Sequence, residues 1–329
     1  MHSAASALPA VGDGRHGSGQ TVVLALDIGG TKLAAGIVDP SGHVHSFLVA
    51  PTFGEQGPER VLERLWELGR TAREASGVPW ADVAAIGVAC GGPLDPCRGV
   101  LLAPPHLPGW RDVPVTALAE EAYGRPAVLE NDATAAAAGE HRYGAGAGTR
   151  NMVYLTISTG VGGGVVVDGR LYRGATGNGG ELGHVTVDRH GRPCRGCGRR
   201  GCLEAYVSGT SIAERAREEG LARTDAADVA AAARDGDARA RAVWDETVDA
   251  LACGLTSIVN LFEPELVVLG GGVSRAGEQL LAPVRERVRA DAMKPAGEAA
   301  EIVQSVLGER VGVVGAAAIA AERGVLSHG

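Results

Sequence analysis

Residues 22–39 read VVLALDIGGTKLAAGIVD, which is a short apolar run, a turn rich in glycine and a second apolar run. The runs at 22–26 and 33–39 have the length and residue types of β-strands, and the two glycines between them allow a tight turn. Glycines also let backbone N–H groups converge on phosphate oxygens, and the threonine hydroxyl adds a donor. This stretch therefore predicts a strand–turn–strand unit that opens an α/β fold and can hold phosphate.

The segments that follow extend this unit to a β-β-β-α-β pattern. A third strand is expected at 43–50, a helix that begins with a proline at 58–76, and a fourth strand at 83–89. Three further elements are then expected: a helix at 114–123, a strand at 126–129 and an alanine-rich helix at 132–142.

A second round of the same pattern begins at residue 151. A strand at 151–157 runs into a glycine-rich turn at 158–164, and a strand at 165–169 follows. Later elements are expected as helices at 210–219, 226–234 and 237–262, a strand at 265–269 running into GGGVS at 270–274, and helices at 275–291 and 312–323. This weak internal repeat predicts two related α/β lobes with a ligand cleft between them.

The overall charge excludes some classes of partner. The chain of 329 residues has a formal net charge of −8, and nucleic acids and anionic membranes both need clustered positive charge on the protein. No apolar run approaches the length of a membrane span, and residues 1–20 lack the apolar segment of a secretory signal. We therefore expect a cytoplasmic protein with a loose tail at 1–20, a small-molecule partner, and neither nucleic acid nor membrane as a partner.

Phosphate binding here cannot depend on a Walker-type loop. The chain has only two lysines, Lys32 and Lys294, and no GxxxxGK[ST] motif. Backbone groups, hydroxyls and Mg²⁺ must serve instead. Asp27, at the end of the first strand, could hold hydrated Mg²⁺, although an Asx-type turn is the alternative, and any single glycine turn could be only a tight turn.

Glu130-Asn131-Asp132 lies at a strand-to-helix junction. Its simpler interpretation is helix capping. The sharper one is that Asp132 accepts the proton of a hydroxyl as that oxygen attacks phosphorus, while Asn131 fixes the alcohol. Both can hold, because a capping position projects its side chain from a rigid element.

Three of the six cysteines are crowded into GRPCRGCGRRGCLEAY at 191–206. His184 precedes them, so one imidazole and the thiolates of Cys194, Cys197 and Cys202 form a set suited to a closed, structural zinc site. The metal would shape a loop that also carries Glu181 and Glu204, whose carboxylates could accept hydrogen bonds from sugar hydroxyls. A fortuitous cluster or a disulfide pair is the alternative.

Together these segments resemble the ROK family of bacterial sugar kinases, in particular its zinc-containing glucokinases. The resemblance covers nearly all of residues 22–323 and is carried by DIGGTK at 27–32, END at 130–132, TGVGGG at 159–164, ELGH at 181–184, CGRRGCLEAY at 197–206 and GGGVS at 270–274. It implies an α/β, two-lobed, actin-like ATPase (ribonuclease H-like) fold with a cleft between the lobes. It also implies transfer of the ATP γ-phosphate to the 6-hydroxyl of a hexose, by a homodimer or homotetramer.

The resemblance assigns residue roles, and it makes Asp132 the catalytic base. The expected sugar ligands are Asn131, Asp132, Glu181, His184, Glu204 and Gly92, or Gly91 in place of Gly92. The expected ATP and Mg²⁺ contacts are Asp27, Gly29, Gly30, Thr31, Lys32, Thr159, Gly160, Gly162 and Gly271, the last near adenosine. His184 would bind structural Zn²⁺ through one ring nitrogen, beside Cys194, Cys197 and Cys202, and face a sugar hydroxyl with the other.

The same resemblance divides the chain into lobes. The small lobe is expected at 21–130 plus 313–329, because the C-terminal helix returns to it, and the large lobe at 131–312, with the zinc-binding loop at 181–204. Three departures from the family pattern stand out: an extra residue between Cys194 and Cys197, His106 where the glucokinase NLPGW segment has asparagine, and Ser158-Thr159 where the phosphate turn has glycine-threonine. His106 either tunes substrate choice or is a surface loop residue.

The favoured function is thus an ATP-dependent hexokinase acting on glucose. Its first alternative is an amino-sugar kinase acting on N-acetylmannosamine, N-acetylglucosamine or 3-amino-3-deoxyglucose. A sugar-responsive transcription repressor is a more distant alternative, because only about 21 residues precede the first strand, too few for a helix-turn-helix domain.

Overall fold

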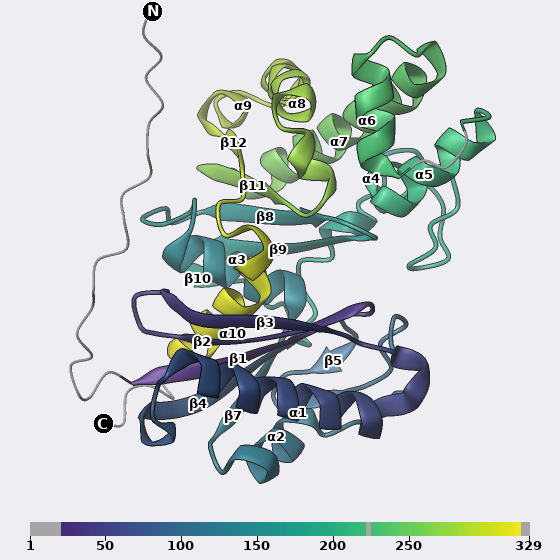
Figure 1. Ribbon diagram of the computed structural model, residues 1–329. Coiled ribbons are helices and arrows are strands. Elements are labelled where there is room, and N and C mark those ends of the chain that lie inside the picture. The colour runs from purple at the N-terminus through teal and green to yellow at the C-terminus, as the bar shows by residue number, and fades with distance from the viewer. Residues whose placement is uncertain (1–20, 222–224, 324–329) are drawn as a thin grey trace, which may run out of the picture.

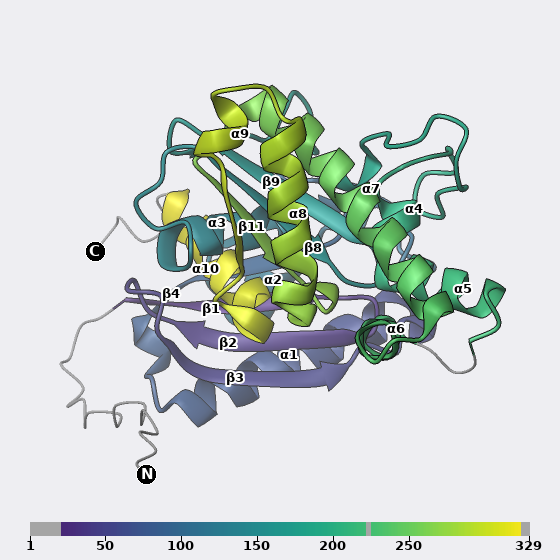
Figure 2. The same ribbon diagram turned by 90° about the horizontal axis from the view of Figure 1, so that it is seen from above.

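The computed structural model describes residues 21–221 and 225–323. The expected tail at 1–20 lies outside them. The described residues form two five-stranded sheets that lie one above the other, with helices between them and on both outer sides (Figures 1 and 2). None of their helices combines the length and apolar content needed to cross a membrane.

The first sheet has the strand order β3-β2-β1-β4-β7. Its strands are β1 (Val22–Ile28), β2 (Lys32–Val38), β3 (Val44–Pro51), β4 (Val83–Cys90) and β7 (Ala127–Asn131). β1 pairs antiparallel with β2 and parallel with β4, so the predicted β-β-β-α-β unit is confirmed. Successive β1 residues are buried on opposite faces: Leu24 and Leu26 pack with α1 (Gly57–Ser76) and α2 (Val115–Tyr123), whereas Val23 and Ala25 pack with α10 (Val311–Glu322).

The second sheet repeats this plan, with the order β10-β9-β8-β11-β12. Its strands are β8 (Met152–Ile157), β9 (Val161–Val167), β10 (Arg170–Leu171), β11 (Leu266–Gly270) and β12 (Glu301–Gln304). β8 pairs antiparallel with β9 and parallel with β11, as β1 does with β2 and β4. The internal repeat predicted from the sequence is therefore confirmed. Helices of this half are α3 (Asp132–Tyr143), α5 (Gly209–Glu218), α6 (Ala226–Arg234), α7 (Ala238–Phe262) and α8 (Glu278–Asp291).

Each of the two helices between the sheets packs on the sheet formed by the other half of the chain. α3 follows the last strand of the first sheet but packs on β8 and β9 of the second, whereas α10 follows the second sheet but packs on β1, β2 and β4 of the first (Figure 1). They also pack on each other so closely that a Cβ at Gly315 would overlap the Ala135 carbonyl oxygen. This close approach explains why both helices are rich in alanine and glycine, and it holds residue 132 rigidly between the sheets. The proposed lobe boundaries stay a prediction.

One predicted turn is wrong over most of its length. The turn expected at 158–164 ends at residue 160, because β9 begins at Val161 and its glycines pair with β8. These glycines allow α3 to pack directly on the β9 backbone, since a Cβ at Gly162 would lie 2.8 Å from the Cβ of Ala133. Several elements are too short to show periodicity in the sequence and were not predicted: β5 (Leu94–Asp95), β6 (Val100–Leu101), β10, β12, α4 (Glu204–Val207) and α9 (Ala296–Ala299).

Candidate active site

Asn131 and Asp132 lie where β7 passes into α3, between the two sheets. The Asn131 side-chain oxygen accepts hydrogen bonds from the backbone N–H groups of Ala133 and Thr134, at 3.0 and 3.1 Å, so Asn131 does cap the helix. Asp132 Oδ1 accepts a 2.8 Å hydrogen bond from the Ala133 N–H. Asp132 is reached by solvent, yet protein surrounds it closely enough that desolvation raises its pKa. The capping interpretation is confirmed for Asn131 and is compatible with a chemical role for Asp132.

Asp27, at the end of β1, lies near enough to Asp132 for the two carboxylates to repel each other. Desolvation, followed by this repulsion, raises the pKa of Asp27 from 3.8 to about 7, and Lys32 offsets part of the effect. The Asp27 carboxylate also lies against Gly312 in the first turn of α10, where any Cβ would overlap it. Two carboxylates held together in this way form a site for a cation or for a proton transfer.

The first glycine turn joins β1 to β2. The Gly29 N–H donates to the Lys32 carbonyl at 3.0 Å, and its carbonyl accepts a 2.7 Å hydrogen bond from the Thr52 hydroxyl. Gly30 and Thr31 are exposed at its tip, and the Thr31 carbonyl accepts a 3.1 Å hydrogen bond from the Thr52 N–H, which leaves the N–H groups at the tip facing outward. The turn thus fits the phosphate contact expected of Gly29, Gly30, Thr31 and Lys32.

The other two glycine turns lie side by side, because they end the neighbouring parallel strands β8 and β11. Gly271 has a φ of +85°, and a Cβ there would overlap the Ile157 carbonyl, so the position requires glycine. Thr159 is exposed in the β8–β9 turn, and a Cβ at Gly160 would lie 2.8 Å from Glu204 Oε2. Gly162, in contrast, lies within β9 and faces α3, which weakens the expectation that it contacts phosphate.

The predicted metal ligands meet at one point. The ligand atoms of His184, Cys194, Cys197 and Cys202 all lie within 4.8 Å of one another. His184 Nδ1 is 3.6 Å from Cys194 Sγ, and the sulfurs of Cys197 and Cys202 are 3.5 Å apart. Sulfurs on a tetrahedral zinc are separated by about 3.8 Å, so the cluster fits zinc, and the cysteines are free rather than paired in a disulfide. The extra residue between Cys194 and Cys197 does not prevent the Cys194 thiol from joining the other three ligand atoms.

Beside this cluster stand the residues expected to bind sugar. His184, whose Nδ1 is near Cys194, has its Nε2 3.9 Å from Glu181 Oε2. Glu204 Oε2 accepts a 3.0 Å hydrogen bond from the Val161 N–H. Desolvation raises the pKa of Glu181, and the charges of Asp132 and Glu204 add to this while His184 opposes it. Glu181 is thus near enough to His184, Glu204 and Asp132 for their charges to act on it, while sugar binding by these residues stays a prediction.

Gly92 lies beside Asn131, and His106 lies near Asp132. A Cβ on Gly92 would lie at an ordinary contact distance, 3.6 Å, from Asn131 Nδ2, so this part of the backbone runs directly beside that amide. His106 is half-buried against Gly30 and Gly91, with Nε2 3.9 Å from Cys90 Sγ. Desolvation lowers the pKa of His106 despite the charge of Asp132. The alternative that His106 is only a surface loop residue is therefore wrong, while its effect on substrate choice stays a prediction.

Similarity to known proteins shows the family to which the chain belongs. The family model described as the ROK family matches residues 23–323. The chain belongs to the ROK family. A glucokinase from Thermotoga maritima is 38% identical to this ROK protein over 315 residues, which cover 92% of this chain and 98% of that one. An N-acetylmannosamine kinase from Salmonella typhi is 37% identical over 273 residues, which cover 82% of this chain and 88% of the relative.

Solved structures of ROK proteins also superpose well. A ROK hexokinase from Thermus thermophilus matches with a TM-score of 0.80 and 40% identity, over 94% of this chain and all of that one. A ROK glucokinase from Streptomyces griseus, solved with glucose and AMPPNP, matches with a TM-score of 0.79 and 33% identity, over 92% and 99% of the two chains. The fold class expected from the sequence, a two-lobed actin-like ATPase, is thereby confirmed.

Two further residues near the site were not anticipated. Arg173 and Asn178 belong to a glycine-rich loop, 172–180, that links β10 to Glu181. Their partners are distant in sequence, so no local pattern could have pointed to them.

Proposed function

We propose that this ROK protein is an ATP-dependent hexokinase that transfers the γ-phosphate of ATP to the 6-hydroxyl of a hexose, with glucose as the preferred substrate. The observation that carries the proposal is the position of Asp132, which lies close enough to Asp27, just before a glycine turn, and to Glu181, beside the metal cluster, to raise the pKa of both. Phosphoryl transfer needs such positioning and charge neutralisation more than covalent chemistry.

The sugar would lie between Gly92 and the wall formed by Glu181, His184 and Glu204. Carboxylate oxygens accept hydrogen bonds from hydroxyls, and the Asn131 amide nitrogen beside Gly92 can donate one. Because Asp132 Oδ1 already accepts from the helix, Oδ2 would take the proton of the 6-hydroxyl as that oxygen attacks phosphorus.

The triphosphate would meet the glycine turn at 29–31 on one side and the turn at 158–160 on the other, with Gly271 near adenosine. Asp27 is placed to hold hydrated Mg²⁺, which neutralises phosphate charge when it is bound. The AMPPNP in the Streptomyces griseus relative supports this assignment of the nucleotide. Lys32, beside Asp27, would contribute a further positive charge.

We assign the histidine and the three thiols to structural Zn²⁺. Four protein ligands fill a tetrahedral ion and leave no position for a reacting water, so its contribution is to the shape of the loop. His184 would serve both sites, with Nδ1 toward the metal and Nε2 toward the sugar. We further expect a cytoplasmic homodimer or homotetramer.

An amino-sugar kinase is the second candidate, and the similarity to the Salmonella typhi N-acetylmannosamine kinase favours it. A coupled ADP-release screen over hexoses and amino hexoses decides between the two, with zinc content measured on the same sample. The proposal expects glucose to give the highest kcat/KM. A higher value with N-acetylmannosamine would establish the second candidate, and ADP release with none of the sugars would refute both.

A further inference from the structure

Glu130 is the member of the 130–132 segment to which the proposed function gives no role. Its side chain is 0% exposed, although it is a carboxylate. A buried carboxylate is retained only where partners compensate for its lost hydration. Glu130 Oε1 accepts a 3.1 Å hydrogen bond from the backbone N–H of Asn131, so it directly contacts a residue of the proposed site.

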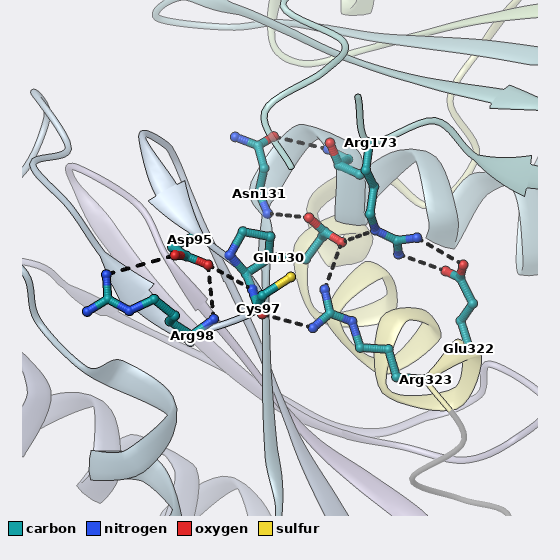
Figure 3. Close-up of polar contacts among 10 residues, drawn as sticks. Asp95, Cys97, Arg98, Glu130, Asn131, Arg173, Glu322 and Arg323 are labelled. Atoms are coloured by element: carbon teal, nitrogen blue, oxygen red, sulfur yellow. Dashed lines mark hydrogen bonds and ion pairs between the residues drawn. The ribbon is translucent and has the colours of Figure 1, made fainter. Parts of the chain in front are cut away.

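The other Glu130 oxygen, Oε2, faces two arginines (Figure 3). Arg173 Nε donates to it at 2.7 Å, and Arg323 Nη2 lies 3.4 Å away. Arg173 also donates from Nη1 and Nη2 to the two carboxylate oxygens of Glu322, at 3.2 and 3.0 Å. Two acidic and two basic groups therefore form a chain of ion pairs, Arg323–Glu130–Arg173–Glu322, which we call the Glu130 network.

The Glu130 network joins parts of the chain that belong to different sheets. Glu130 lies on β7 of the first sheet, and Glu322 and Arg323 lie at the end of α10, which packs on that sheet. Arg173 comes from the loop that follows β10 of the second sheet, and the preceding Tyr172 N–H donates to the Val165 carbonyl of β9 at 2.8 Å. The Arg173 guanidinium is thus a direct link from one half of the molecule to the other.

The loop that carries Arg173 has a second anchor before it reaches the sugar wall. Asn178 Nδ2 donates to the Leu94 carbonyl at 3.2 Å, and Asn178 Oδ1 lies 3.4 Å from the Leu94 N. The Gly179 N–H donates to the Arg173 carbonyl at 2.9 Å, which closes the loop between its anchors. Glu181 follows two residues later, so its position depends on both anchors.

We propose that Glu130 and Arg173 are positioning residues for the sugar pocket. Their ion pair holds the loop 172–180, and with it Glu181, against the strand end that presents Asn131 and Asp132. This inference rests on the proposed function, because it assigns Glu181 and Asn131 to sugar binding. It predicts a defect in sugar binding that is separate from nucleotide binding, since the Glu130 network touches none of the three glycine turns.

The test is a set of kinetic constants for glucose and ATP in the full-length protein. Arg173→Gln should raise the KM for glucose by ~10-fold or more while the KM for ATP stays within about twofold, because small displacements of binding groups cost this much. Arg173→Lys keeps a charge for Glu130 but loses the two-point contact with Glu322, so it should recover part of the affinity for glucose. Arg150→Gln is the matched control, since Arg150 pairs with Asp168 at 2.8 Å on an exposed surface of the same half, and it should change neither constant.

Glu322→Gln is a second variant that tests the same positioning role if Arg173→Gln does not fold. Glu322 is 39% exposed and its loss leaves Glu130 paired, yet it should still raise the KM for glucose by about threefold. A KM for glucose within the error of wild type in the folded variants would overturn the positioning role, as would equal rises in both KM values. A wild-type protein that releases no ADP with glucose or any other hexose would instead refute the proposed function itself.

Discussion

The raised pKa of Asp27 leads to a prediction about stability that is independent of any activity assay. A pKa that rises from 3.8 to about 7 on folding means that the ionised carboxylate is disfavoured in the folded protein. At about 1.4 kcal/mol for each tenfold change in the proton equilibrium, the cost at neutral pH is at most roughly 4 kcal/mol. Asn has nearly the same size and carries no charge, so Asp27→Asn should relieve most of this cost.

The effect depends on pH in a defined direction. Below pH 3.8 the carboxyl is protonated in both the folded and the unfolded chain, so it imposes no penalty. Between pH 3.8 and about 7 the unfolded chain ionises while the folded protein keeps the proton, and wild type progressively loses stability. Above about pH 7 the full penalty is present. The variant should therefore gain stability over wild type as the pH rises through this range.

Urea unfolding at pH 5, 6, 7 and 8 measures this difference. We expect the free energy of unfolding of Asp27→Asn to exceed that of wild type by about 2–4 kcal/mol at pH 8 and by less at pH 5. Asp245→Asn, which changes an exposed carboxylate on α7, is the control and should stay within about 0.5 kcal/mol of wild type. A difference at pH 8 that is absent, negative or equal to that at pH 5 would refute this account of Asp27. The stabilised variant should nonetheless be a poor kinase, because the same carboxylate is assigned to Mg²⁺.

Three further changes test other parts of the molecule. Asp132→Asn keeps the side-chain oxygen that accepts a hydrogen bond from the Ala133 N–H, so calorimetry should show a glucose affinity within about threefold of wild type. In a coupled ADP assay its kcat should fall ~10²-fold or more. Near-normal turnover would show that Asp132 is not the catalytic base. Cys202→Ser should lower the zinc content measured by atomic spectrometry well below one ion per chain and raise the KM for glucose, and full zinc retention would contradict the ligand assignment. Gly315→Ala should destabilise the protein by ~1–3 kcal/mol, because the added methyl overlaps the Ala135 carbonyl, whereas Gly272→Ala meets nothing within 4 Å and should be close to neutral in the same thermal melts.

The sequence was most informative where the chemistry is local. Three features each lie within a short segment: the strand that carries Asp27, the helix capped by Asn131 and the metal ligands from His184 to Cys202. Their residue types and spacing could therefore be interpreted directly. The repeat of strand and glycine turn was also visible, and it predicted the two similar sheets.

The sequence failed where one role is shared by distant segments. Gly162 looked like part of a turn, but it is a strand residue whose missing side chain makes room for α3, and α3 is placed there only by the tertiary fold. Arg173 contacts Glu130, 43 residues away, and Asn178 contacts Leu94, 84 residues away. No local feature of a glycine-rich loop predicts such distant contacts. The clustering of Asp27 with Asp132 likewise depends on the strand order, which puts β1 and β7 on either side of β4.

The exchange of α3 and α10 also constrains how the chain is made. The face of the first sheet that contains Val23 and Ala25 is covered by α10, which begins only at Val311. During synthesis the N-terminal end emerges first, so that apolar face stays uncovered until nearly the whole chain has left the ribosome. The first sheet therefore cannot bury this face on its own, and a nascent chain that stalls before residue 311 would leave the face open to aggregation unless a chaperone covered it.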